Sequence, residues 1–222
     1  MEIRRLPAEE PLLERFVGEL WLPYRRELEA KGRGNELADD VNIVDQEVAF
    51  RRELLERYDH WTWVAVDGDG GDDGGDGGGT GDGGGTGDGG GTGDDGDGNA
   101  VGSDRPLDDS GPPQDHADGE REWEGGGHLA GFVTAELDVA SPVFDRPDRL
   151  HVGDIYVHAD YRGAGLGRRL LELVAHRARE LACAELTLDV DVDNEPAVGF
   201  YERLGFEPRR WEMCVDVDSL RL

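Results

Sequence analysis

A glycine-rich turn stands between a strand-like segment and a helix-like segment in the second half of the chain. It reads Arg162, Gly163, Ala164, Gly165, Leu166, Gly167, Arg168. The first amides of a helix lack intrahelical partners and carry partial positive charge, and glycines leave those amides open to an anion. Together with the neighbouring arginines, the turn predicts a phosphate or pyrophosphate site. The alternative is a glycine-rich turn that only links a strand to a helix.

Two common phosphate-binding motifs do not fit this turn. A P-loop needs a Lys-Ser or Lys-Thr pair after its last glycine, and this chain has Arg168-Arg169 there. A dinucleotide-binding fold needs a third glycine where Arg168 stands, and it needs the motif in the first strand-helix unit. The turn therefore indicates a different phosphate-containing ligand.

The segments that must position the turn predict one compact domain over residues 1–222, with a mixed sheet and helices on its faces. The periodicity of apolar residues favours helices from about 12 to 22, 45–58, 168–181 and 195–204. Strands are expected at 2–6, 60–68, 128–140, 149–160 and 184–192, and the run 206–217 is expected to close the chain as a last strand or hairpin half.

Residues 67–127 differ from the rest of the chain because they are dominated by Gly and Asp. Such a segment cannot bury enough apolar area to offset the cost of ordering its backbone, so we expect a disordered acidic insertion between two strands. Its repeated GDGGGT hexad raises calcium binding as an alternative. A calcium-binding β-helix, however, needs a nonapeptide period with an aliphatic residue in each turn, and both are missing.

The composition limits the partners. The net charge is −28, from 51 acidic and 23 basic residues, and Lys31 is the single lysine. Nucleic acid and anionic membranes are therefore not expected partners. An acidic, lysine-poor surface favours adaptation to high salt, with an ordinary acidic cytoplasmic protein as the alternative. Cys183 and Cys214 lack metal-site spacing and are expected to be buried thiols, so no metal is expected. The charged N-terminus is unlike a signal peptide or a membrane span, so a cytoplasmic location is expected.

The motif R-x-x-G-x-G at Arg162–Gly167, preceded by IYVHADY and followed by NEPAVGFYERLGF, resembles the GNAT superfamily of acyl-CoA-dependent N-acetyltransferases. The resemblance is specific over residues 150–206. It implies an α/β (α+β) fold with a mixed, mostly antiparallel central sheet, helices on both faces, and an acetyl-CoA cleft between splayed central strands. Ala159, where the family often has proline, and the Gly/Asp-rich insertion depart from the family pattern.

The resemblance also implies a set of acetyl-CoA contacts. Amides from Arg162 to Arg168 would hold the pyrophosphate, and the strand at Ile155, Tyr156 and Val157 would receive the pantetheine arm. Asn194 matches a residue that contacts the pantetheine side, although it could equally cap the helix that follows. The cofactor-binding residues expected are thus Ile155, Tyr156, Val157, Arg162, Gly163, Ala164, Gly165, Leu166, Gly167, Arg168 and Asn194.

Three residues are candidates for the chemistry. Tyr201 matches the tyrosine that protonates the departing thiolate in the family; its alternative role is a core aromatic. Attack on a thioester needs a neutral amine, so a base must remove a proton. Asp189, five residues before Asn194, and Asp154, on the strand that receives the cofactor, are the candidates, and a solvated carboxylate is the alternative for both.

The resulting expectation is an N-acetyltransferase that moves an acetyl group from acetyl-CoA to a primary amine by direct attack. Its expected partners are acetyl-CoA, the amine acceptor and a second copy of the chain. The rivals are a non-catalytic acyl-CoA-binding module and an interaction or calcium-binding protein that acts through its acidic arm. The sequence does not identify the acceptor.

Overall fold

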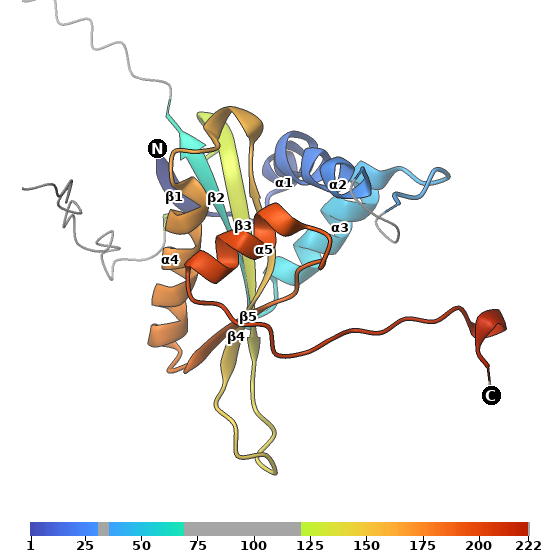
Figure 1. Cartoon of the computed structure of the whole chain (residues 1–222). Coiled ribbons are helices and arrows are strands. Elements are labelled where there is room, and N and C mark those ends of the chain that lie inside the picture. The colour runs from blue at the N-terminus through green and yellow to red at the C-terminus, as the bar shows by residue number, and fades with distance from the viewer. Residues whose placement is uncertain (31–35, 69–120, 222) are drawn as a thin grey trace, which may run out of the picture.

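The computed structural model describes residues 1–30, 36–68 and 121–221. Within them, five strands form one sheet in the order β1 (Glu2–Arg5), β2 (His60–Asp67), β3 (His128–Asp138), β4 (Arg149–Val157) and β5 (Glu185–Leu188). Strands β1 to β4 pair antiparallel, and β5 pairs parallel with β4 (Figure 1). The expected mixed, mostly antiparallel sheet is confirmed.

Helices from the N-terminal part of the chain cover one face of the sheet: α1 (Glu10–Phe16), α2 (Leu22–Glu29) and α3 (Ile43–Leu55). Between α1 and α2 the helix widens into a π-helical segment, Val17–Trp21, directly before Pro23 in the first turn of α2. A proline cannot donate the usual backbone bond, which accounts for a change of helix type at this point. Phe16 packs edge-on against Phe132 of β3 with ring centroids 5.0 Å apart, which fixes this layer on the sheet.

The opposite face carries α4 (Leu166–Glu180) and α5 (Glu195–Arg203). The predicted apolar stripe of α4 is confirmed, since Leu166, Leu170, Leu173, Val174 and Ala178 are all buried against the sheet. The helix α5 ends at Arg203 with Leu204 as its C-cap, and the following Gly205 has a φ of +91°, the left-handed conformation that favours glycine after a helix end.

The insertion is shorter at its C-terminal end than predicted. Most of it, residues 69–120, lies outside the described residues. Residues 121–127 were expected to be disordered, but Trp123 is 1% exposed, its backbone N–H donates to the Arg5 carbonyl at 3.0 Å, and its indole N–H donates to the Gly126 carbonyl at 2.9 Å. Trp123 packs among the α1-side core residues, and Arg15 of α1 donates to the Gly127 carbonyl at 2.6 Å, so contacts with the folded body hold this polar stretch.

The last predicted strand is wrong. Within the described chain, residues 207–216 have no regular secondary structure and run away from the sheet, followed by a short 3-10 turn at Val217–Ser219 (Figure 1). The expected strand at 184–192 is also too long, because β5 ends at Leu188 and Val192 is exposed. Cys214 lies on the exposed tail, so the expectation of two buried thiols is wrong for it, and Cys183 is half-buried.

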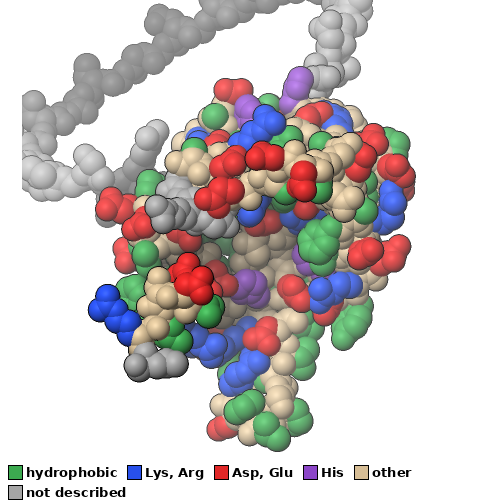
Figure 2. Space-filling view, turned by 90° about the vertical axis from the view of Figure 1, so that its right-hand side faces the viewer, with side chains coloured by type: hydrophobic (Ala, Val, Ile, Leu, Met, Phe, Trp, Pro, Cys, Tyr) green, Lys and Arg blue, Asp and Glu red, His purple; other side chains and the backbone are tan. Residues whose placement is uncertain are grey.

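The surface view in Figure 2 shows acidic and basic side chains interspersed over the face that carries α1 to α3, with hydrophobic side chains at the projecting tip below. No helix in the described ranges is long and apolar enough to cross a bilayer.

Candidate functional site

The central feature of the site is the second half of β4, which lacks a strand partner on one side. β5 pairs with β4 from Arg149 to Val152 and then ends at Leu188. Beyond that point β4 continues to Val157 while paired with β3 alone among the described strands. The two parallel strands therefore separate, and a backbone edge is left open, as the splayed-strand cleft predicts.

A β-bulge opposite Thr134 shapes this part of β4. Val133 pairs with Ile155 and Ala135 with Val152, so Gly153 and Asp154 share one partner. A Cβ on Gly153 would lie 2.7 Å from the Thr134 hydroxyl oxygen, so a larger residue would not fit without displacement. The Asp154 amide donates to that same hydroxyl at 2.7 Å, which holds the bulge in place.

The open edge presents specific backbone groups. The His158 amide donates to the Ala130 carbonyl of β3 at 2.9 Å, and the Tyr156 carbonyl also approaches β3 at Gly131. Successive residues of a strand direct their backbone groups to opposite edges, so those of Ile155 and Val157 face the open side. Two of the three predicted strand residues thus offer their backbone to a ligand, whereas the Tyr156 ring packs into the α1-side core.

The glycine-rich turn follows directly. Gly163 and Gly165 have φ values of +78° and +82°, and Gly165 is the N-cap of α4 without any side-chain cap. A Cβ on either glycine would meet no atom within 4 Å, so the space in front of the first helical amides is open. Leu166 points the other way and is 2% exposed in the core, while Ala164 and Arg168 are exposed. The backbone of this turn fits an anion.

The arginines contribute less free charge than predicted. Arg162 forms a two-bond ion pair with Glu27 of α2 at 2.8 Å, donates to the Val157 carbonyl at 2.9 Å, and lies over the Tyr156 ring. Arg168 pairs with Glu172 at 2.8 Å on the exposed side of α4. In this structure Arg162 ties the turn to α2, and the backbone amides are the groups that remain open.

Asp154 lies in a buried polar cluster that crosses from β4 to α2 and α3. Its carboxylate accepts from the Tyr24 hydroxyl at 3.2 Å and pairs with Arg51 at 3.1 Å. Arg51 is 4% exposed and also pairs with Glu47 at 2.5 Å. Burial raises the pKa of Glu47, and burial together with Asp154 raises the pKa of Tyr24 well above its usual range.

Tyr201 reaches the same region from the opposite layer. It is 9% exposed, packs against Phe200 and Phe206, and no described residue forms a hydrogen bond with its hydroxyl. Burial raises the pKa of this hydroxyl to about 12, so it keeps its proton at neutral pH. Tyr201 is also close enough to Tyr24 to contribute to that residue's raised pKa. Asp154 is thus bound to Tyr24, and Tyr201 lies near enough to Tyr24 to affect its pKa.

The remaining candidates are placed differently. Asn194 is the N-cap residue of α5 but makes no side-chain cap hydrogen bond, so its amide group remains free of that alternative role. Asp189 follows the end of β5 rather than standing on it, and its carboxylate is fully exposed, 3.9 Å from His151. His151 borders a hollow of about 400 Å³ together with Thr187 and the end of β3.

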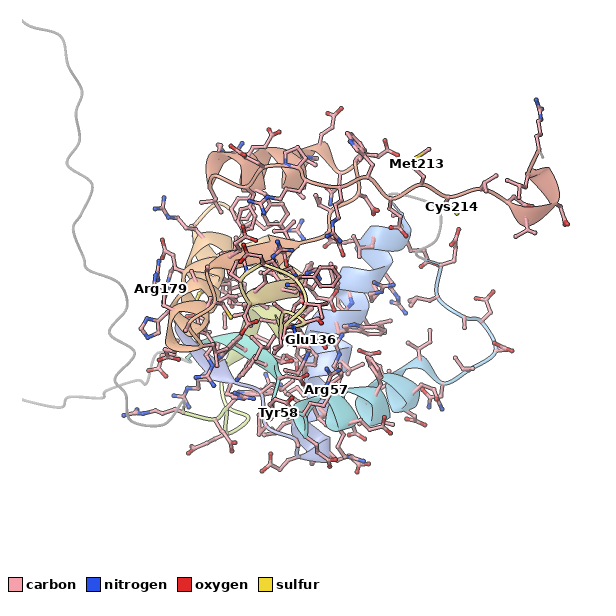
Figure 3. The ribbon with its side chains drawn as sticks, turned by 90° about the horizontal axis from the view of Figure 1, so that it is seen from below. Arg57, Tyr58, Glu136, Arg179, Met213 and Cys214 are labelled. Carbon is pink, nitrogen blue, oxygen red and sulfur yellow. The ribbon has the colours of Figure 1, made fainter. Side chains whose placement is uncertain are left out.

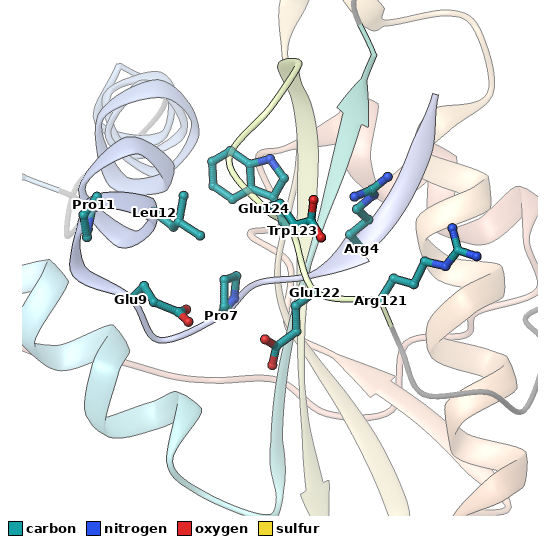
Figure 4. A pocket seen from close by; sticks show the side chains of 9 residues that line it. All are labelled: Arg4, Pro7, Glu9, Pro11, Leu12, Arg121, Glu122, Trp123 and Glu124. Atoms are coloured by element: carbon teal, nitrogen blue, oxygen red, sulfur yellow. The ribbon is translucent and has the colours of Figure 1, made fainter.

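A larger hollow of about 820 Å³ lies elsewhere, where residues 121–124 meet the segment between β1 and α1 (Figure 4). None of the predicted site residues lines it. No group of three or more His, Cys, Asp or Glu side chains suited to a metal ion occurs among the described residues.

Four residues of the site were missed: Tyr24 and Glu27 on α2, and Glu47 and Arg51 on α3. The ion pair between Glu47 and Arg51 could have been predicted from their i,i+4 spacing on one helix face. The contact of Arg51 with Asp154 could not have been predicted, because the two residues are 103 positions apart in the sequence.

Comparison with known proteins gives a consistent result. Residues 103–206 match the Acetyltransferase (GNAT) family. Glucosamine 6-phosphate N-acetyltransferase of Trypanosoma brucei brucei is 36% identical over 78 residues, 34% of this chain and 51% of that protein. Streptothricin acetyltransferase of Streptomyces lavendulae is 34% identical over 119 residues, 48% of this chain and 60% of that protein. The chain therefore spans a little over half the length of these two relatives.

The fold is also similar to that of solved structures. A tetramutant of the BH1408 protein from Bacillus halodurans superposes with a TM-score of 0.58 at 14% identity, with 98% of this chain and 100% of that chain covered. This likeness concerns the fold, which is GNAT-like, with a five-stranded mixed sheet between two helical layers.

Proposed function

We propose that this chain is a GNAT-type N-acetyltransferase that transfers the acetyl group of acetyl-CoA to a primary amine. The observation that carries the proposal is the combination of an open β4 edge and an open glycine-rich helix start, one directly after the other in the chain. Only a ligand with both an extended amide-bearing arm and a phosphate group uses both features. The family match and the names of the relatives support the same reaction class.

The residues present fit acetyl-CoA. The first amides of α4, with Gly163 and Gly165 leaving space in front of them, would hold its pyrophosphate. The backbone groups of Ile155 and the backbone amide of Val157 would pair with the pantetheine arm as an added strand does. The free side-chain amide of Asn194 would bind the same arm from the α5 side. When bound, acetyl-CoA supplies an acetyl group already activated as a thioester.

Tyr201 is the proposed general acid. As the amine nitrogen forms its bond to the acetyl carbon, the carbon–sulfur bond breaks, and the Tyr201 hydroxyl gives its proton to the departing thiolate. Its raised pKa keeps the proton available at neutral pH, and its hydroxyl has no described partner that would hold the proton back. Most of the rate gain in such a direct attack comes from positioning the two reactants.

Asp154 is the proposed acceptor of the amine's proton, directly or through Tyr24. Its support is its position on β4, the strand with the open edge, where its carboxylate accepts a hydrogen bond from Tyr24. Asp189 is the second candidate, and its full exposure makes it the weaker one. In this proposal Arg51 is a positioning residue that orients the Asp154 carboxylate.

Salt adaptation completes the proposal. Its support is the net charge of −28 with a single lysine. An enzyme of this composition should keep its activity at molar salt, where screening removes most of the repulsion among its carboxylates.

A thiol-release assay with acetyl-CoA, run at low and at molar salt, tests the function. The amine panel should include a peptide N-terminus, a polyamine, an amino acid, glucosamine 6-phosphate and streptothricin, the last two because relatives are named for them. We expect thiol release that depends on one class of amine, with the acetylated amine identified by mass spectrometry. Binding of coenzyme A by calorimetry without turnover on any amine would instead support a non-catalytic acyl-CoA-binding module. Absence of binding would overturn both.

A further inference from the structure

One arginine beside the proposed site lacks the partner that an arginine in its position normally has. Arg25 of α2 is half-buried, and its Nε is enclosed without a hydrogen bond. No hydrogen bond or ion pair joins its guanidinium to a residue that the structure describes. A cation that is partly removed from water is normally paired, because its burial without a partner costs free energy. Arg25 therefore has donors available for a group outside the chain.

Arginines in a comparable environment are paired. Arg149 and Arg177 share with Arg25 an enclosed Nε that has no hydrogen bond. Arg149 nevertheless forms an ion pair with Glu185 at 2.7 Å, and Arg177 forms one with Glu180 at 2.9 Å. Each of these two cations is thus compensated by a carboxylate within the chain. Arg25 differs from them because it lacks such a carboxylate.

The same contrast holds within the helical layer that contains α2 and α3. Figure 3 shows Arg57, just after α3, next to Glu136, with which it forms an ion pair. On α2 itself, Glu29 stands one turn after Arg25, at the spacing at which a helix can form an ion pair. The Glu29 carboxylate accepts a hydrogen bond from the Leu37 amide at 3.4 Å instead. The nearest acidic residue on the helix therefore leaves Arg25 unpaired.

Arg25 lies beside the polar cluster of the proposed site. Its guanidinium carbon is 5.9 Å from the centre of the Trp21 ring, and that of Arg51 is 6.0 Å from the same ring. Burial raises the pKa of Glu47, and Arg25 is close enough to oppose part of that rise. Since Arg51 binds both Glu47 and Asp154, the unpaired cation lies close to the group that contains the proposed proton acceptor.

The charges of Arg25 and Asp154 together fit a dipolar acceptor. The side chain of Asp154 is 25% exposed, so it can attract an ammonium group and take its proton as proposed above. The guanidinium of Arg25 offers a planar fork of N–H donors, which matches the oxygens of a carboxylate or a phosphate. A neutral or purely cationic amine leaves this fork unpaired. An amine that also carries an anionic group uses both charges.

We propose that Arg25 determines acceptor specificity by binding an anionic group, a carboxylate or a phosphate, on the same molecule as the reacting amine. This inference rests on the proposed acetyltransferase function. The acceptor class is then an amino acid or a phosphorylated amine, and not a polyamine. The contact fixes one end of the acceptor on α2 and so places the other end, the amine, toward β4.

Matched pairs of amines test this preference on the unaltered protein. In the thiol-release assay, β-alanine is compared with β-alaninamide, and O-phosphoethanolamine with ethanolamine. The anionic member of at least one pair should have a kcat/KM at least about tenfold higher than its neutral partner, because hydrogen bonds between two charged groups are the stronger ones. The pair that responds distinguishes a carboxylate from a phosphate. Equal kcat/KM within both pairs would overturn the proposal.

Replacing Arg25 by glutamine tests the residue itself. Arg25→Gln should raise the KM of the preferred anionic amine at least about tenfold, while kcat and the KM of acetyl-CoA stay nearly unchanged. The KM of the neutral partner should not change, and this comparison cancels the intrinsic difference in reactivity between the two amines. Arg26→Gln is the matched control, because Arg26 is the adjacent, exposed arginine of the same helix. It should leave every constant unchanged.

A purely structural role of Arg25 predicts a different result. If Arg25 only compensates the buried carboxylates, Arg25→Gln should impair both members of a pair alike, and that outcome would contradict the proposal. Arg25→Lys keeps the charge but not the planar fork, so it should recover part of the lost affinity for the anionic amine. Should Arg25→Gln fail to fold by circular dichroism, the matched pairs and Arg25→Lys still decide.

Failure of the inference and failure of the proposed function give separate results. Thiol release with a polyamine, but with neither β-alanine nor O-phosphoethanolamine, would overturn the role of Arg25 and leave the acetyltransferase function in place. Absence of thiol release with every amine of both panels would overturn the two together.

Discussion

The guanidinium of Arg51 on α3 lies 3.1 Å from the carboxylate of Asp154 on β4, and it simultaneously pairs with Glu47. One buried cation thus compensates two carboxylates that are mostly removed from water. This contact joins the helical layer of the N-terminal part to the strand that lies at the centre of the proposed site. It makes Arg51 the residue on which both stability and the orientation of Asp154 depend.

Replacing Arg51 by methionine should destabilise the fold strongly, because it leaves Glu47 and Asp154 buried without their common partner. We expect a loss of roughly 3 kcal/mol in the free energy of unfolding, measured in urea. Arg52→Met is the matched control. Arg52 pairs with Glu10 on an exposed surface, so its loss should stay below about 1 kcal/mol. Equal losses of unfolding free energy in the two variants would mean that the buried ion pairs of Arg51 stabilise the fold no more than the exposed pair of Arg52.

Replacing Gly165 by alanine should weaken coenzyme A binding. A side chain at this left-handed position is strained, and its Cβ enters the space in front of the first α4 amides. We expect at least about tenfold weaker binding by calorimetry. Gly205→Ala places the same change at a position with a φ of +91° and open space, but at the end of α5. If Gly205→Ala weakens binding as much, the effect reflects strain alone and not the turn.

Replacing Tyr201 by phenylalanine should reduce kcat while the affinity for coenzyme A stays nearly unchanged, since only the hydroxyl is removed. A positioned general acid contributes about 10² to 10⁴ in rate. Because burial raises the pKa of Tyr201 to about 12, the parent enzyme should show no loss of activity from this group up to about pH 10. Unchanged turnover in the variant would remove Tyr201 from the mechanism.

Replacing each aspartate by asparagine should distinguish the two candidate bases in steady-state kinetics. Asp154→Asn is expected to lower kcat, because it removes the proposed proton acceptor but keeps the shape of the side chain. Asp189→Asn should leave kcat unchanged, since its carboxylate is fully exposed. The reverse result would move the base to the end of β5.

Acid should destabilise the protein through His60. Burial lowers the pKa of His60 to about 4 in the folded chain, whereas an unfolded histidine titrates near about 6.5. The unfolded state therefore binds a proton first as the pH falls, and the stabilisation present above about pH 6.5 is lost progressively down to about pH 4. At pH 5 the cost is on the order of 2 kcal/mol. Urea midpoints at pH 7 and pH 5 should converge in His60→Gln; an unchanged difference would exclude this origin.

Much of this fold could be predicted from local sequence patterns. The glycines of the turn and the stripe of α4 need only neighbouring residues to be interpreted, and the structure has both where they were expected. Contacts between residues far apart in the sequence could not be predicted. The link from Arg51 to Asp154 depends on how α3 lies on the sheet, and Trp123 orders a polar stretch through a core built by other segments.

The last strand illustrates a second limit. The alternation at residues 211–217 predicts a strand, but the described segment is not one, because alternation alone does not provide an edge for a strand to pair with. A sequence pattern specifies what a segment can pair with chemically, and the length of β5 and the direction of the tail decide the rest.

The contact of Trp123 with Arg5 has a consequence for the connection between β2 and β3. It joins residues 121–123 to the end of β1 and so fixes the start of the β3 side of the β2–β3 connection. A longer connection costs little free energy beyond this contact, because the entropy lost on closing a loop grows only with the logarithm of the loop length. We therefore expect the length of this connection to be variable with little effect on the stability of the sheet. A short linker in place of residues 69–120 should be accepted equally well.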